Sequence, residues 1–210
     1  MQYRKIRKEY KYGQLSDDAM QEDPMALFEA WIHDAQESMG MDVTAFTLST
    51  VDSAGMPDAR ILLLKDLGTR DMTFYTNWLS KKSQDLHTNP KAHALFFWPM
   101  QERQIRVQGT VRKLPFEEGA AYFSERPIAS QQAAMASTQS APIASRDDLE
   151  AAYKEVCDRG EEAVRCPEHW GGYAMSMDRI EFWQGRPNRL HDRIVFEFAQ
   201  GEWTTERLQP

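Results

Sequence analysis

Hydrophobic and polar residues follow two different periods along the chain, and these periods separate predicted helices from predicted strands. In residues 23–40 the apolar side chains recur at helical spacing. Asp23 is suited to cap such a helix, Pro24 suits its first turn, and Gly40 ends the pattern. The pattern therefore predicts an amphipathic helix from Pro24 to Met39.

Alternating, β-branched and aromatic segments indicate strands in most of the remaining chain. The predicted strands cover residues 43–51, 59–65, 72–76, 92–98 and 103–114, and two or three more within 173–183, 189–199 and 202–208. Helical patterns return at 79–90, 115–126 and 145–160. The segment 127–145 is rich in small residues, and its pattern does not decide between helix and loop. The sequence QGE at 200–202 is predicted to form a hairpin turn.

The arrangement of these elements favours one fold class. Short strands with inserted helices, without regular β–α alternation, are typical of an antiparallel α+β domain built around a barrel-like sheet. Residues 1–22 are strongly charged and show little periodicity. We therefore predict a mobile amino-terminal arm, residues 1–22, followed by a single domain over 23–210.

Composition excludes several classes of protein. The 210 residues include 25 basic and 32 acidic side chains, and the net charge of −7 argues against a general nucleic-acid binder. The two cysteines, Cys157 and Cys166, give neither a disulfide framework nor a metal-ligand pattern. The basic start lacks the apolar stretch of a signal peptide, and no apolar run is long enough to span a membrane. We expect a cytoplasmic protein without metal, membrane or nucleic-acid partners.

Common catalytic motifs are also missing. The chain contains no G-x-G-x-x-G, G-x-x-x-x-G-K-[ST], G-x-S-x-G or H-E-x-x-H sequence. Rossmann dinucleotide binding, P-loop chemistry, serine hydrolysis and zinc peptidase activity therefore lose their usual support.

The sequence RLHDR, residues 189–193, places three cation-capable side chains close together. If the segment is extended, Arg189, His191 and Arg193 share one face at about 6.6 Å intervals. Such groups repel one another unless an anion joins them, so the row predicts an anionic ligand. A solvated strand face, with a purely structural histidine, is the alternative.

Other cationic residues follow similar patterns. Lys81 and Lys82 come directly after Ser80 at a predicted helix start, where free backbone N–H groups and two ammonium groups favour phosphate. An ordinary solvated helix face is the alternative. Arg60 and Lys65 lie five residues apart, so a regular strand sends them to opposite faces. Their joint action would need a bulge, a strand end or a partner chain.

An ordered set of segments carries a family resemblance. The segments ARILLLK, FYTNWLSKK, ERQIRVQG, YFSERPIAS, QS at 139–140, WGG and IEFWQGRPNRLHDR occur in this order. Together, from about Arg7 to the carboxyl terminus, they resemble the pyridoxamine 5'-phosphate oxidase family, the flavin enzymes of vitamin B6 metabolism. The resemblance implies an FMN-binding split-barrel fold with flanking helices and a homodimer that holds FMN at its interface. It also implies oxidation of pyridoxamine or pyridoxine 5'-phosphate to pyridoxal 5'-phosphate.

The resemblance assigns roles by position in these motifs. FMN contacts fall on Arg60, Ile61, Leu62, Leu63, Leu64, Lys65, Tyr75, Thr76, Lys81, Lys82, Gln104, Gln139, Ser140, Trp183 and Arg193. Substrate contacts fall on Arg7, Tyr10, Lys65, Tyr122, Arg126, Ser130, Arg189 and His191, with Arg7 and Tyr10 in the arm that closes over the substrate.

The implied reaction transfers a hydride from substrate carbon C4' to flavin N5, and O2 then reoxidises the flavin to give H2O2. Arg189 and His191 are the catalytic candidates beside the reacting ring. The chain departs from the family pattern at Lys81, where the family often has arginine, and at Met135, where an aromatic residue is common. Lysine keeps the charge but loses the bidentate geometry of arginine.

Three other functions are compatible with parts of the sequence. A split-barrel flavin reductase or an oxidase of a related amine would not require Tyr122, Arg126 and Ser130 beside the RLHDR motif. A noncatalytic carrier of FMN or pyridoxal phosphate would not consume oxygen with pyridoxamine 5'-phosphate. RNA binding fits the basic alternation of RQIRVQGTVRK at 103–113, but not the acidic net charge.

Overall fold

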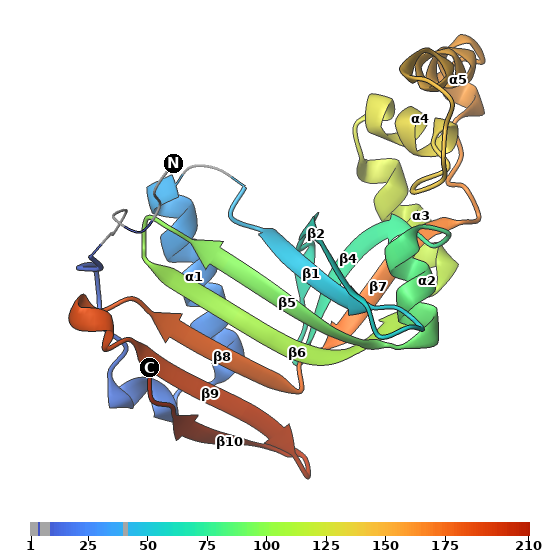
Figure 1. The fold of residues 1–210 in the computed structure, drawn as a ribbon. Helices are drawn as coiled ribbons and strands as arrows, with labels where there is room; N and C mark the ends of the chain where they lie inside the picture. The colour runs from blue at the N-terminus through green and yellow to red at the C-terminus, as the bar shows by residue number, and fades with distance from the viewer. Residues whose placement is uncertain (1–3, 5–8, 40–41) are drawn as a thin grey trace.

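The computed structural model describes residue 4, residues 9–39 and residues 42–210. These residues form a ten-stranded antiparallel sheet and five α-helices (Figure 1). The strands are β1 Ala45–Val51, β2 Pro57–Leu63, β3 Asp66–Leu67, β4 Asp71–Asn77, β5 Lys91–Trp98, β6 Arg103–Lys113, β7 Trp170–Ser176, β8 Arg179–Gln184, β9 Asp192–Ala199 and β10 Glu202–Arg207. The α-helices are α1 Pro24–Met39, α2 Lys81–Thr88, α3 Phe116–Glu125, α4 Ile128–Ala136 and α5 Arg146–Asp158. Short 3-10 helices are η2 Asp17–Gln21, η3 Glu161–Ala163 and η4 Pro187–Arg189.

Strand β6 joins the two parts of the sheet. The main path runs β10-β9-β8-β6-β5-β1-β2, and β6 also pairs with β7, which pairs with β4. The change of partner occurs near Gly109, where an added Cβ would lie 1.6 Å from the carbonyl oxygen of Ser176. Only glycine permits this approach, and the sheet curls there into an open barrel. The predicted antiparallel α+β, split-barrel architecture is confirmed.

Helix α1 covers one face of the main sheet (Figure 1). Asp23 accepts hydrogen bonds from the backbone N–H groups of Met25 and Ala26, as expected of an N-cap residue. Phe28 packs edge-on against Phe96 in the core. The helix predicted from the hydrophobic pattern is therefore confirmed, including its start.

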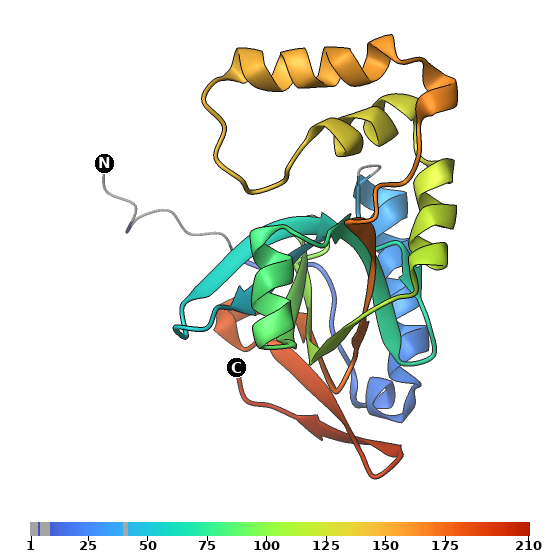
Figure 2. The same cartoon turned by 90° about the vertical axis from the view of Figure 1, so that its right-hand side faces the viewer.

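Helices α4 and α5 form a hairpin that extends away from the sheet (Figure 2). The predicted cap of α5 is present, since the Ser145 hydroxyl oxygen accepts the backbone N–H of Asp148. The segment 127–145, which the sequence pattern left undecided, divides into a helix, α4, and a loop. The β9–β10 hairpin turns at Gln200 and Gly201, both with positive φ, which confirms the predicted turn.

The amino-terminal segment is tied to the body of the protein. Leu15 and Ala19 are buried in the core. The Lys11 backbone N–H donates to Glu102, and the Leu15 N–H donates to Asp192. The segment predicted as an arm, residues 1–22, thus contributes two apolar side chains to the core.

Among the described residues, no helix combines the length and apolar character needed to cross a membrane. The same residues contain no group of three or more acidic, histidine or cysteine side chains that could hold a metal ion.

Candidate active site

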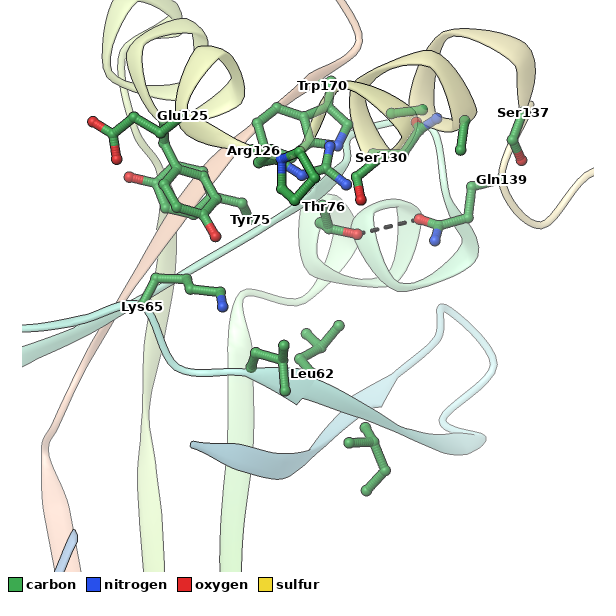
Figure 3. Close-up of a pocket in the computed structure, with 17 residues that line it drawn as sticks. Leu62, Lys65, Tyr75, Thr76, Glu125, Arg126, Ser130, Ser137, Gln139 and Trp170 are labelled. Atoms are coloured by element: carbon green, nitrogen blue, oxygen red, sulfur yellow. Dashed lines mark hydrogen bonds between the residues drawn. The ribbon is translucent and has the colours of Figure 1, made fainter. Parts of the chain in front are cut away.

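A cleft of about 780 Å³ lies between β2, β4 and the α3–α4 segment (Figure 3). It brings together many of the residues that the motifs nominated. Its lining includes Ile61, Leu62, Leu63, Lys65, Tyr75, Thr76, Tyr122, Arg126, Ser130 and Gln139. The cleft thus collects nominated residues that lie up to 78 positions apart in the chain, from Ile61 to Gln139. They come from β2, β4, α3, α4 and the loop that follows α4.

Lys82 lies at the edge of this cleft and is 7% exposed. Its ammonium group donates to the side-chain oxygens of Thr76, Ser80 and Gln139 at 3.1–3.2 Å. Within the described residues no carboxylate forms an ion pair with it. Burial, with a smaller effect of Arg60, lowers the pKa of Lys82 to about 8. An anionic ligand would relieve this unpaired buried charge.

Arg126 is a further cation of the cleft without a carboxylate partner among the described residues. Its guanidinium lies over the Trp170 ring, 4.8 Å from the ring centre (Figure 3). Its Nη1 atom is buried and has no hydrogen-bond partner among the described residues. Burial lowers the pKa of Arg126. An oriented guanidinium with a free donor is suited to a phosphate. One carboxylate, that of Glu125, also lines the cleft.

Close packing of α3 on β7 places Arg126. An added Cβ at Gly119 would lie 2.8 Å from the Cα of Gly171, so the helix approaches the strand as closely as glycine allows. The approach brings Tyr122 onto Tyr75, with ring centres 4.1 Å apart. The stacked rings form one wall of the cleft.

A second group of nominated residues lies at the far end of the main sheet. Tyr10 contacts both Trp183 and His191 edge-on, with ring centres 5.6 Å apart in each pair. Trp183 is paired across the strands with Gln104 on one side and Arg193 on the other. This group, Tyr10, Gln104, Trp183, His191 and Arg193, is called the ring cluster below.

The prediction that RLHDR is an extended strand is wrong for its first three residues. Strand β9 begins only at Asp192, and Arg189 ends the 3-10 turn η4. Asn188 and Arg189 have left-handed φ values of 56° and 62°. The Arg186 backbone N–H donates to His191 Nδ1 across this turn, at 3.1 Å. Arg189 and His191 therefore leave from a tight turn and not from one strand face.

Arg193 already has an anionic neighbour. Its Nε and Nη2 atoms lie 2.8 Å from a carboxylate oxygen of Glu181, which is 1% exposed. Arg106 and Arg179 contact the same carboxylate. The RLHDR row predicted an anionic ligand next to Arg193. The Glu181 carboxylate of the same chain already supplies part of that negative charge. Because Arg106 belongs to this network, the basic alternation of β6 also has an explanation without RNA.

The cleft and the ring cluster share one face of the sheet but lie apart. Strand pairing places Ile61 of β2, Thr47 of β1 and Leu95 of β5 in one row, which continues through Arg106 to Glu181 of β8. Four strand spacings separate β2 from β8, or roughly 19 Å. The side chains of Ile61 and Phe97 on this face are 62% and 49% exposed. Exposed apolar side chains between two polar clusters indicate that another surface packs against this face of the sheet.

The remaining nominated residues lie elsewhere. Arg60 points to the opposite face from Ile61 and contacts Asp58 and Thr50, and β2 ends at Leu63, so Lys65 lies beyond the strand. Leu64 is buried in the core. Lys81 is exposed and pairs with Asp85, so a solvated helix face describes Lys81 but not Lys82. Ser140 is exposed next to Gln139. Arg7 lies outside the described residues.

Trp170 begins the WGG motif but is not among the site residues that the family resemblance implies. Trp170 pairs with Asn77 across β4 and β7, lines the cleft and packs against the Arg126 guanidinium. The glycines that follow Trp170 were the available signal, because adjacent glycines in a strand indicate close approach of another backbone.

Comparison with known proteins agrees with the motif resemblance. The family model described as pyridoxamine 5'-phosphate oxidase matches residues 32–159, and one described as pyridoxine 5'-phosphate oxidase C-terminal dimerisation region matches 170–210. The chain belongs to the pyridoxamine 5'-phosphate oxidase family. A relative from Pseudomonas paraeruginosa (strain DSM 24068 / PA7), named pyridoxine/pyridoxamine 5'-phosphate oxidase, is 46% identical over 98% of this chain and 97% of its own. A relative of the same name from Legionella pneumophila (strain Lens) is 46% identical over 98% and 96%.

Two solved structures resemble the fold. PhzG from Burkholderia lata 383, solved in complex with tetrahydrophenazine-1-carboxylic acid, has a TM-score of 0.89 and 26% identity over 95% of this chain and 99% of its own. A pyridoxamine 5'-phosphate oxidase-related, FMN binding protein from Nostoc punctiforme PCC 73102 has a TM-score of 0.71 and 17% identity, covering 91% and 100%. The second likeness shows the fold alone. Because the chain belongs to the pyridoxamine 5'-phosphate oxidase family, the cleft residues are compared with the phosphate groups of that family's ligands.

The cleft residues fit the phosphate groups that the family resemblance implies. In the part of the chain that the structure describes, the buried Lys82 ammonium has no ionic partner and the buried Nη1 of Arg126 has no hydrogen-bond partner. Ser130 and Thr76 add hydroxyl groups to the same lining. Lys65 and Arg126 line the cleft and Lys82 lies beside it, so the cations suit the two phosphates of a flavin mononucleotide and a phosphorylated substrate.

Proposed function

We propose that the protein is an FMN-dependent oxidase that converts pyridoxamine 5'-phosphate and pyridoxine 5'-phosphate to pyridoxal 5'-phosphate. The observation that carries the proposal is the pair of cations that adjoin one cleft, the buried Lys82 and the half-buried Arg126, neither of which has a carboxylate partner among the described residues. Membership of the oxidase family supports this choice of ligands. Bound FMN would accept two electrons from substrate carbon C4' and pass them to O2, giving H2O2.

The cleft residues divide into two phosphate sites in this proposal. Lys82, with Thr76 and Gln139, binds the phosphate of FMN, because these three side chains form one hydrogen-bonded group. Arg126, with Lys65, Tyr122 and Ser130, binds the phosphate of the substrate. Binding energy at that remote phosphate fixes the position of the reacting carbon.

The ring cluster completes the site from a second subunit. The uncovered sheet face carries cleft residues at β2 and ring-cluster residues at β8 and β9, too far apart to enclose one ligand within a single chain. A two-fold axis over this face would bring the ring cluster of one subunit to the cleft of the other. The match of residues 170–210 to a dimerisation region supports this arrangement. Arg189 and His191 then orient the substrate ring, and Tyr10 covers it.

The visible absorption spectrum of the purified protein tests the proposal. Flavin absorbance should bleach when pyridoxamine 5'-phosphate is added without air, and it should return when air is admitted. A yellow protein that does not bleach would retain the FMN site but refute the substrate, and tetrahydrophenazine-1-carboxylic acid would be the next substrate to try because PhzG was solved with it. A protein that cannot be loaded with FMN would refute both parts.

A further inference from the structure

The hydrogen bond across the turn at residues 186–191 determines which nitrogen of His191 carries a proton. A backbone N–H group can only donate, so the Arg186 N–H at 3.1 Å requires a lone pair on His191 Nδ1. In the neutral imidazole the single proton then resides on Nε2. The nitrogen that faces away from the turn is therefore a donor.

The turn holds this arrangement at a conformational cost. Asn188 and Arg189 are consecutive non-glycine residues in the left-handed region, which is rarely populated and persists only where neighbouring contacts hold it. The Arg186 side chain donates to Asp192 at 3.2 Å and closes the turn from the other side. The rings of Tyr10 and Trp183 contact the imidazole and restrict its rotation.

The surrounding charges disfavour a second proton on His191. Burial lowers the pKa of His191, the positive charge of Arg189 lowers it further, and Asp192 has a smaller opposing effect. The Arg186 guanidinium is engaged by Asp192, which weakens that opposing effect. A proton on Nδ1 would also point at the Arg186 N–H. The imidazole is accordingly neutral at pH 7, with Nε2–H as its donor.

We propose that the turn at 186–191 fixes His191 as a neutral Nε2–H donor, so that it gives a hydrogen bond to an oxygen of the substrate ring and does not act as a base. The inference rests on the proposed function for the identity of the ligand. A ring hydroxyl or phenolate oxygen is the acceptor that suits a neutral N–H donor beside the Arg189 cation. Any proton released by the substrate amine passes to another acceptor.

Nitrogen NMR of the full-length, 15N-labelled protein measures the tautomer without substrate. His191→Gln assigns the His191 signals among the five histidines of the chain. We expect a protonated Nε2 and an unprotonated Nδ1 from pH 8 down to pH 7, with and without FMN. A protonated Nδ1 or an imidazolium in this range would overturn the inference whether or not the protein oxidises pyridoxamine 5'-phosphate. Asn188→Gly should keep the tautomer, whereas Asn188→Val, which resists the left-handed conformation, should mix the two forms.

Rapid reduction kinetics separate a donor from a base. Glutamine can place a neutral N–H near the position of Nε2, but it cannot accept a proton at neutral pH. His191→Gln should therefore keep the rate of flavin reduction within about 10-fold, whereas His191→Ala should lose more. A base would be lost equally in both variants, by about 100-fold or more. Equal losses of that size would overturn the donor role.

Discussion

Arg126→Ala is expected to lower kcat/KM for pyridoxamine 5'-phosphate by about 100- to 1000-fold while FMN binding changes little. The loss corresponds to about 3–4 kcal/mol of charge-assisted hydrogen bonding from a desolvated guanidinium. Arg126→Lys should recover only part of it, because lysine lacks the bidentate geometry and the planar contact with Trp170. Steady-state oxygen consumption and FMN titration measure the two effects.

The unphosphorylated substrate provides the sharper control for Arg126. If the guanidinium binds the substrate phosphate, Arg126→Ala should have little effect on the slow oxidation of pyridoxamine, which has no phosphate to lose contact with. Arg146→Ala is a matched surface control, since the Arg146 side chain is 80% exposed and its one ionic partner among the described residues is Glu150 of the same helix. Equal losses with both substrates would contradict the phosphate role and would point to disruption of the cleft.

Lys82→Met is expected to stabilise the cofactor-free protein and to weaken FMN binding at the same time. The folded-state pKa of Lys82 is about 8, below its unfolded value of about 10.4. Below pH 8 both states are protonated, and the folded state bears the cost of the buried charge. As pH rises from 8 to about 10.4 that cost disappears, because only the unfolded state still binds the proton. Methionine removes the cost at every pH.

Two measurements on Lys82→Met test whether stability rises while FMN binding weakens. The free energy of unfolding of the cofactor-free protein at pH 7 should rise by about 1–3 kcal/mol, and the gain should shrink toward pH 10. The Kd for FMN at pH 7 should rise by about 100-fold. Lys154→Met, at an exposed position of α5, should change neither value. A variant that is less stable yet binds FMN normally would show that the ammonium serves packing.

Local patterns were sufficient for most of the fold. The cap at Asp23 and the apolar stripe after it define α1, because both depend on residues within a few positions of each other. The RLHDR segment was predicted wrongly, although Pro187 and Asn188 just before it are turn-forming residues. The alternation of Arg189, His191 and Arg193 fits a strand equally well, so it did not reveal the turn that ends at Arg189.

The site depended on contacts that no local pattern contains. Lys81 and Lys82 are adjacent and chemically identical, yet one is exposed and the other buried. Lys82 donates to Gln139, 57 positions further along the chain, whereas Lys81 pairs with Asp85 of its own helix. Trp170 beneath Arg126 is a comparable case, 44 positions away. The motif resemblance nominated Lys82, Gln139 and Arg126, but only the structure shows how burial divides their roles.

The separation of the cleft from the ring cluster within one chain has a genetic consequence. Arg126→Ala disables the cleft and Arg189→Ala disables the turn beside the ring cluster, so each variant alone should form inactive dimers. In a mixed dimer the two lesions fall together in one site and leave the other site intact. Random mixing gives half mixed dimers, so coexpression should restore about a quarter of the wild-type activity. Absence of complementation, with mixed dimers shown to form, would place both arginines in the site from the same subunit.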